Sequence, residues 1–236
     1  MIFYRVSIDV GKRKKFACGC LAEIINYEKS PCPACSIEVV TPNLFEMFED
    51  KAFNIKMHMD RDYYADFMCS QIRDIVSERA KEMLSDNFSN SVDFASIGMV
   101  SLRDLSPSFL KYYRDRYGSK EVKRIPDDPP QYHRLLLKQG ADLDFKKSNI
   151  QLIFECSTCG RKKYDIPYSH YKDDGFALIY LIESTWNGRD IFYVEGMGNT
   201  VFCTERFIEV YSQHELTGLE FAQISTSGCK GDLKSL

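Results

Sequence analysis

The sequence predicts an α+β protein in which a mixed or antiparallel sheet is flanked by helices. Short segments near both ends of the 236-residue chain have the strand-like alternation of side chains with a period of two. Other segments repeat apolar side chains with a period near 3.6, as helices with one buried face do. Two Cys-x-x-Cys pairs, at 32–35 and 156–159, lie beside strand-like segments far apart in the chain. We therefore expect one domain over 1–236.

The N-terminal 40 residues are expected to form strands. In 1–10, Ile2, Tyr4 and Val6 alternate with side chains of the opposite face, and 16–26 and 38–40 have similar strand character. The basic segment 11–15 between the first two is expected to be an exposed turn. Two prolines in 30–35 exclude a helix there.

The middle of the chain is expected to be largely helical. Thr41-Pro42 combines a good cap residue with a proline, as helix starts often do. A longer helix is predicted over 62–86, with an apolar stripe made of Ile72, Ile75, Val76, Ala80, Met83 and Leu84. A further helix over 104–117 should stop at Gly118, and the proline-containing segment 119–142 is predicted to be a link.

The C-terminal part returns to strands and ends with a helix and a strand. Residues 150–154 lead into the second cysteine pair, and 176–182 and 189–194 are plausible buried segments. Thr204 can cap a helix whose buried face would hold Phe207, Val210, Tyr211 and His214. Residues 219–224 have the pattern of a closing strand.

Composition and charge narrow the class of protein. The net charge of -3 gives no overall attraction to nucleic acid or to an anionic membrane. No apolar run approaches the ~20 residues that a membrane-spanning helix needs, and the N-terminus has no pattern of a signal peptide. Nine cysteines without an export signal favour a reducing cytoplasm, where grouped cysteines are metal ligands or redox groups.

The two cysteine pairs together offer the four ligands of a structural zinc site. Zinc prefers four thiolate or imidazole ligands in a tetrahedron, and two cysteines separated by two residues can both face one ion. Gly160, directly after the second pair, can adopt the positive φ that closes such a turn, whereas Ser36 follows the first pair. We predict one structural Zn²⁺ bound by Cys32, Cys35, Cys156 and Cys159 in a zinc-ribbon-like site of two distant knuckles. Because 120 residues separate the knuckles, the metal would join 1–40 to 143–225 in a zinc-linked α/β core, with 41–142 as a helical insertion or subdomain.

Other uses of these cysteines remain open at this stage. Cys18 and Cys20 could complete a local site with the first pair, or His170 could replace a ligand of the second. A dithiol redox role is a further alternative, although neither pair precedes a convincing helix that would lower a thiol pKa. The remaining thiols are expected to be small apolar or incidental residues, namely Cys69, Cys203 and Cys229.

The chain also resembles a known family at both ends. The segments that carry the resemblance are Phe3-Tyr4-Arg5, the pair at 32–35, Cys156-x-x-Cys159-Gly160-Arg161, Asp190–Val194, Gly198–Phe207 and Leu216–Phe221. In this order they resemble the bacterial double-CxxCG motif family, which is expanded as paralogues in myxobacteria. Ser36 departs from the glycine of that family, and roughly 45–140 gives no match. Since some members look like immunity proteins encoded beside toxins, the resemblance implies a cytosolic antitoxin that acts as a protein inhibitor.

These observations predict a zinc-binding immunity protein that neutralises a cognate toxin domain. The alternative is a zinc-ribbon nucleic-acid-binding or regulatory protein that uses Lys12–Lys15 and Arg161–Lys163, the basic clusters near the cysteines. We expect a toxin partner in the cytoplasm and neither membrane nor nucleic acid as a partner. No hydrolase or nucleotide-binding motif is present, and four thiolates leave no open metal position, so we assign no catalytic residue and expect no enzyme.

Overall fold

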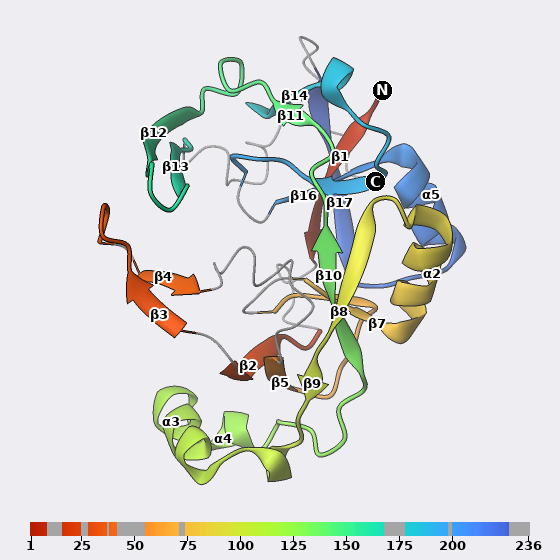
Figure 1. The fold of residues 1–236 in the computed structure, drawn as a ribbon. Coiled ribbons are helices and arrows are strands. Elements are labelled where there is room, and N and C mark those ends of the chain that lie inside the picture. The colour runs from red at the N-terminus through yellow and green to blue at the C-terminus, as the bar shows by residue number, and fades with distance from the viewer. Residues whose placement is uncertain are drawn as a thin grey trace.

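A computed structural model describes residues 1–8, 16–24, 28–36, 38–41, 55–70, 74–167, 178–197 and 200–226. It is an α+β protein with several mostly antiparallel sheets and few helices, as the sequence predicts. Figure 1 shows the largest sheet and two helices on one side of the molecule and two separate hairpins on the other. Among the described residues, no helix has the length and apolar character needed to cross a bilayer.

The largest sheet brings the two ends of the chain together. Its six strands, in spatial order, are β11 (Asp142–Leu143), β14 (Tyr180–Ile182), β17 (Leu219–Thr226), β1 (Phe3–Ile8), β16 (Val201–Thr204) and β15 (Ile191–Tyr193). All neighbours are antiparallel except β14 and β17. The first strand thus lies between two C-terminal strands, with Phe3 opposite both Thr204 and Ile224.

Two further sheets are built mainly from the middle of the chain, with one strand from its N-terminal part. One is ordered β6 (Phe67–Met68), β7 (Ile75–Ser77), β10 (Tyr132–Leu137) and β8 (Val92–Ser96), and the other is ordered β2 (Gly19–Ile24), β5 (Ile55–Met59) and β9 (Gly98–Met99). The described part of 41–142 is therefore not the mainly helical insertion that the sequence suggested. Its side chains also share one core with both chain ends, because Leu84 and Phe67 lie in the same buried cluster as Tyr4 and Phe207.

Helices cover this core and extend one end of the molecule. They are α2 (Glu78–Phe88), η1 (Leu102–Asp104), α3 (Pro107–Tyr117), α4 (Ser119–Val122), η4 (Glu183–Thr185) and α5 (Glu205–Gln213). Phe88 at the end of α2 contacts Phe207 of α5, with 5.3 Å between their ring centroids. Gly118 ends α3 with a φ of 94°, the stop predicted for it.

The predicted helix over 62–86 is wrong in its first part. Ile75 and Val76 belong to β7 and pair with β10, and α2 begins only at Glu78. Ser77 makes this break, since its hydroxyl accepts a hydrogen bond from the Ala80 N–H at 3.2 Å. The apolar spacing of the strand happens to continue the stripe of the helix, so periodicity alone could not separate them.

The predicted link over 119–142 also needs correction, because it contains β10, a central strand of the four-stranded sheet. Five of its six residues are buried, so its apolar run lacks the alternation that marks a half-exposed strand. His214 was expected on the buried face of α5 but is exposed. The helix predicted to start at Thr41-Pro42 lies outside the described residues, apart from Thr41, the last residue of β4.

Candidate metal centre

Each cysteine pair forms the turn of a two-stranded hairpin. The first hairpin joins β3 (Glu28–Pro31) to β4 (Glu38–Thr41), and the second joins β12 (Gln151–Glu155) to β13 (Lys162–Asp165). The hairpins lie on the same side of the molecule, opposite α2 and α5 (Figure 1). This arrangement allows turns that are more than 120 positions apart in sequence to meet.

The two turns have the same backbone geometry. The Ser36 N–H donates to the Cys32 carbonyl at 2.8 Å, and the Gly160 N–H donates to the Cys156 carbonyl at the same distance. Ser36 has a φ of 58° and Gly160 a φ of 67°, so both residues are left-handed. The glycine therefore does what the sequence predicts, and the serine at the equivalent position adopts the same conformation. We did not predict from the sequence that Ser36 closes the first turn, although its position directly after Cys35 matches that of Gly160 after Cys159.

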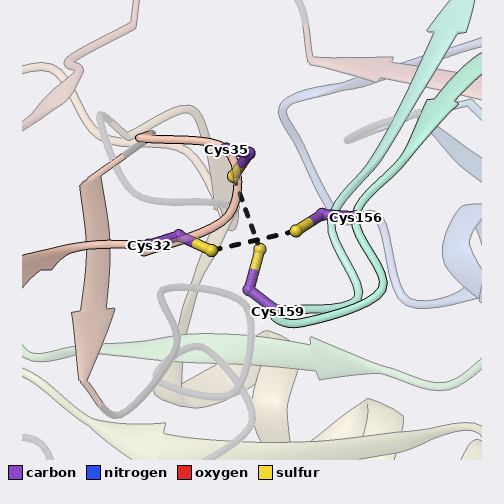
Figure 2. A group of neighbouring side chains, drawn as sticks. All are labelled: Cys32, Cys35, Cys156 and Cys159. Atoms are coloured by element: carbon purple, nitrogen blue, oxygen red, sulfur yellow. Dashed lines mark hydrogen bonds between the residues drawn. The ribbon is translucent and has the colours of Figure 1, made fainter.

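The four sulfur atoms converge in the space between the turns (Figure 2). The Cys32 and Cys156 Sγ atoms are 3.8 Å apart, the Cys35 and Cys159 Sγ atoms are 3.9 Å apart, and all four lie within 4.8 Å of one another. A regular tetrahedron with metal–sulfur distances of ~2.3 Å has edges of about 3.8 Å. Disulfide sulfurs would be only ~2.0 Å apart. The spacing therefore fits four ligands of one metal ion, and the predicted residues are brought together as a set.

Backbone N–H groups prepare one cysteine of each pair to be a thiolate. Those of Cys159 and Thr158 lower the pKa of Cys156 to about 6, and those of Cys35 and Ala34 lower the pKa of Cys32. The Arg161 N–H lowers the pKa of Cys159, but burial and hydrogen bonds to the other sulfurs outweigh it and raise this pKa to about 11. The cluster thus resists carrying further negative charge unless a cation lies between the sulfurs.

The centre is partly shielded from solvent. Cys32 and Cys156 are each only 3% exposed, while Cys35 and Cys159 are of intermediate exposure. Four thiolates complete a tetrahedral shell, which is the arrangement of structural rather than catalytic zinc sites. The donor set and its spacing can hold a metal ion that links the two hairpins.

The other cysteines and the histidines that the structure describes are not part of this cluster. Within the described ranges, no second group of three or more metal-ligating side chains converges, so the local site with Cys18 and Cys20 is not formed. Cys203 is fully buried in β16, as a small apolar residue would be. His170 and Cys229 lie outside the described residues.

The structure describes only the second of the two basic clusters near the cysteines. Lys12–Lys15 lies outside the described residues. In the second cluster, Lys162 forms ion pairs with Glu195 at 2.6 Å and with Glu155 at 4.0 Å. Glu155 lies on the same hairpin, whereas the contact with Glu195 ties the knuckle end of the hairpin to the body of the protein.

The second hairpin also has a feature that sequence reasoning missed. All five residues of β12 are exposed, including Leu152, Ile153 and Phe154, which are 47%, 52% and 39% exposed. The sequence predicted strand character over 150–154 but gave no sign of this exposure. The hairpin has only two strands, however, so it offers no second layer to cover them.

Fold and site together define an α+β protein with a zinc-ribbon-like, four-cysteine centre made of two knuckles. No protein-family model matches the chain, and a search of curated proteins finds no match.

Proposed function

We propose that this chain is a zinc-stabilised immunity protein that binds and neutralises a cognate bacterial toxin domain in the cytoplasm. The exposed apolar strand β12, which sits on the hairpin of the second knuckle, is the observation that carries the proposal. The resemblance of both chain ends to the double-CxxCG motif family supports the assignment to immunity proteins. Inhibition would follow from occlusion of the toxin's active site.

The metal in this proposal is zinc and its role is structural. Soft thiolate ligands in a tetrahedron favour Zn²⁺ over the oxygen-preferring divalent ions. A filled four-thiolate shell leaves no position for water or substrate. The ion would therefore fix the orientation of the two hairpins and, with them, the surface that the partner contacts.

The apolar strand has the chemistry of a protein-binding surface. Three consecutive large apolar side chains, Leu152, Ile153 and Phe154, project from both faces of β12. Contiguous exposed apolar residues mark interaction sites more often than scattered ones do. Arg161 and Lys163 on the same hairpin are exposed and form no ion pair with another described residue. An apolar patch bordered by such cations fits a partner surface with an apolar centre and an acidic rim.

Co-expression tests this proposal. The probe is the product of the gene adjacent to that of this protein, and growth and complex formation are the readouts. Wild type should restore growth and co-purify with the toxic product. Ile153→Asp should abolish both effects while leaving metal content unchanged, whereas Tyr112→Asp, a matched exposed site on α3, should leave both intact. Absence of protection and of a complex with wild type would reject the immunity function.

A specific observation also favours a second candidate, a nucleic-acid-binding function on α3 and α4. These helices protrude at one end of the molecule (Figure 1), and 107–124 has a net charge of +4 in a chain of net charge -3. Tyr112 and Tyr117 are 53% and 46% exposed. The Arg116 guanidinium lies 5.5 Å from the Tyr117 ring centroid. Cations beside exposed aromatic rings can neutralise phosphates and stack on bases.

The same pair of variants separates the two functions. A fluorescent single-stranded RNA serves as the probe, titrated at two salt concentrations. The second candidate predicts binding that weakens with salt and is lost in Tyr112→Asp but kept in Ile153→Asp. No binding at low salt would exclude it.

A further inference from the structure

We propose that Cys18, directly before β2, and Cys69, directly after β6, are a redox-active pair that a hydroperoxide converts into a disulfide. Their Sγ atoms are 2.8 Å apart, although the two residues are 51 positions apart in sequence. The pair is separate from the metal centre and from the proposed partner surface. It therefore adds a modification site that does not depend on the proposed function.

The distance between these sulfurs distinguishes them from the metal-centre cysteines. In the metal centre the paired Sγ atoms are 3.8 and 3.9 Å apart, close to the edge expected of a tetrahedral zinc site. Cys18 and Cys69 are about 1 Å closer, too near for two ligands of one tetrahedral ion and nearer to the ~2.0 Å of a covalent S–S bond. The same chain thus contains two kinds of sulfur pair, one spaced for a metal and one for a bond.

Backbone contacts hold the two cysteines in place. The Gly19 N–H donates to the Cys69 carbonyl at 2.9 Å, and Gly19 and Ser70 form an isolated parallel bridge. The Cys18 N–H donates to the Asp60 carboxylate at 2.8 Å, and the Asp60 N–H donates to the Cys18 carbonyl at 3.2 Å. Because both segments are already fixed beside each other, bond formation requires only a small movement of the sulfurs.

The surroundings assign different roles to the three thiols of this region. The hydrogen bond between the two sulfurs lowers the pKa of Cys69 and raises the pKa of Cys18. Burial raises the pKa of the neighbouring Cys20 to about 11, which keeps it a thiol. Cys18 and Cys69 are both partly exposed, so a small oxidant can reach them, whereas Cys203 is fully buried.

The reaction balances with hydrogen peroxide as the oxidant. The Cys69 thiolate attacks one peroxide oxygen, the O–O bond breaks, and the leaving hydroxide takes up the proton that Cys69 had released, giving water. The Cys18 sulfur then attacks the Cys69 sulfenic acid, the S–O bond breaks, and the second water leaves with the Cys18 proton. Two thiols are oxidised by two electrons in total, and one peroxide is reduced to two waters.

Peptide mapping of the full-length, zinc-loaded protein tests the pair. The protein is treated with one equivalent of hydrogen peroxide, free thiols are alkylated, and the digest is analysed without reductant. The expected product is a Cys18–Cys69 linked peptide, two hydrogens lighter than the two thiol peptides, that dithiothreitol separates while zinc content stays unchanged. Oxidation should also raise the thermal unfolding midpoint of wild type.

Variants in the same cluster serve as controls. Cys20→Ser should retain the link, whereas Cys18→Ser and Cys69→Ser should lose it and show no rise in the unfolding midpoint on oxidation. Separate alkylation of Cys18 and Cys69 in peroxide-treated wild type, or a link through Cys20, would overturn the proposal. The wild-type peptide map decides this even if a serine variant does not fold.

Discussion

The equivalence of the two knuckles can be tested by exchanging their left-handed residues. Gly160 has a φ of 67°, and a Cβ built on it would contact no atom within 4 Å. Gly160→Ala should therefore add no clash, and its cost is conformational. A left-handed non-glycine residue costs roughly 1–2 kcal/mol, and the stiffer unfolded chain returns about 0.4–1 kcal/mol. We expect a net loss of about 0.5–1 kcal/mol.

The reverse change at the first knuckle should have the opposite sign. Ser36 has a φ of 58°, and its hydroxyl forms no hydrogen bond with any residue that the structure describes. Ser36→Gly should therefore stabilise the protein by a similar amount, which corresponds to about 1–4 °C in the unfolding midpoint of a chain of this size. Metal affinity should change little in either variant.

Thermal and denaturant unfolding of the metal-loaded protein measure both effects. Gly188→Ala is the matched control, since Gly188 has a φ of 88°, equally open surroundings and a position outside both hairpins. It should cost at least as much as Gly160→Ala, because its φ lies further from the left-handed region of roughly 50–70° that other residues adopt. A loss above about 3 kcal/mol or release of the metal in Gly160→Ala, or destabilisation by Ser36→Gly, would refute this account of the knuckles.

Three further predictions concern the metal and the core. One zinc per chain should be found by elemental analysis of wild type and be lost from both Cys32→Ser and Cys156→Ser; zinc retained in either variant would contradict a shared site. Apparent zinc affinity should fall by at least about tenfold per pH unit below neutrality because Cys159, with its pKa raised to about 11, must release a proton to bind. The fall should steepen below about pH 6, where Cys156, with its pKa lowered to about 6, also becomes protonated. Chelator competition between pH 5 and 8 measures this slope, and a slope that stays constant would argue against thiolate stabilisation by the backbone. Gly218→Ala should destabilise the protein by more than about 3 kcal/mol, a severe effect of strain. The new Cβ would lie 2.0 Å from the Phe67 carbonyl oxygen, at a φ of 105°. Near-normal stability would show that the backbone at Gly218 and the backbone at Phe67 can separate without cost.

The metal centre was predictable because its signal is chemical. Cysteines spaced by two residues place both sulfurs on one side of a tight turn, and a four-ligand ion requires two such turns. Neither requirement depends on the sequence between the knuckles, so the site could be predicted although Cys35 and Cys156 are far apart in the chain. The terminal strand β1 was predictable from the alternation of its residue types, although both of its faces are buried in part, since Phe3 lies in one buried cluster and Tyr4 and Val6 lie in another.

The middle of the chain was less predictable because tertiary contacts override its local patterns. The spacing of Ile75 and Val76 fits the apolar stripe of a helix, yet both residues belong to a strand. Pairing of this strand with β10 is what favours the strand over the helix. Ser77 was the local signal for the break, as a capping residue directly before Glu78. In β10 itself, burial on both faces removes the alternation by which a strand is recognised.

The position of the metal centre explains why a metal would be needed at all. Each knuckle closes a hairpin of only two strands, which is marginally stable by itself in water. The second hairpin has an entirely exposed strand, and its described contacts with the core run through β13, where Tyr164 stacks on Phe145 with ring centroids 5.4 Å apart. The large sheet, by contrast, already unites the chain ends through β1, β16 and β17. A metal would thus add little to the sheet, and it would link the two hairpins directly to each other. That placement makes the metal a determinant of the exposed surface of β12 rather than of the core.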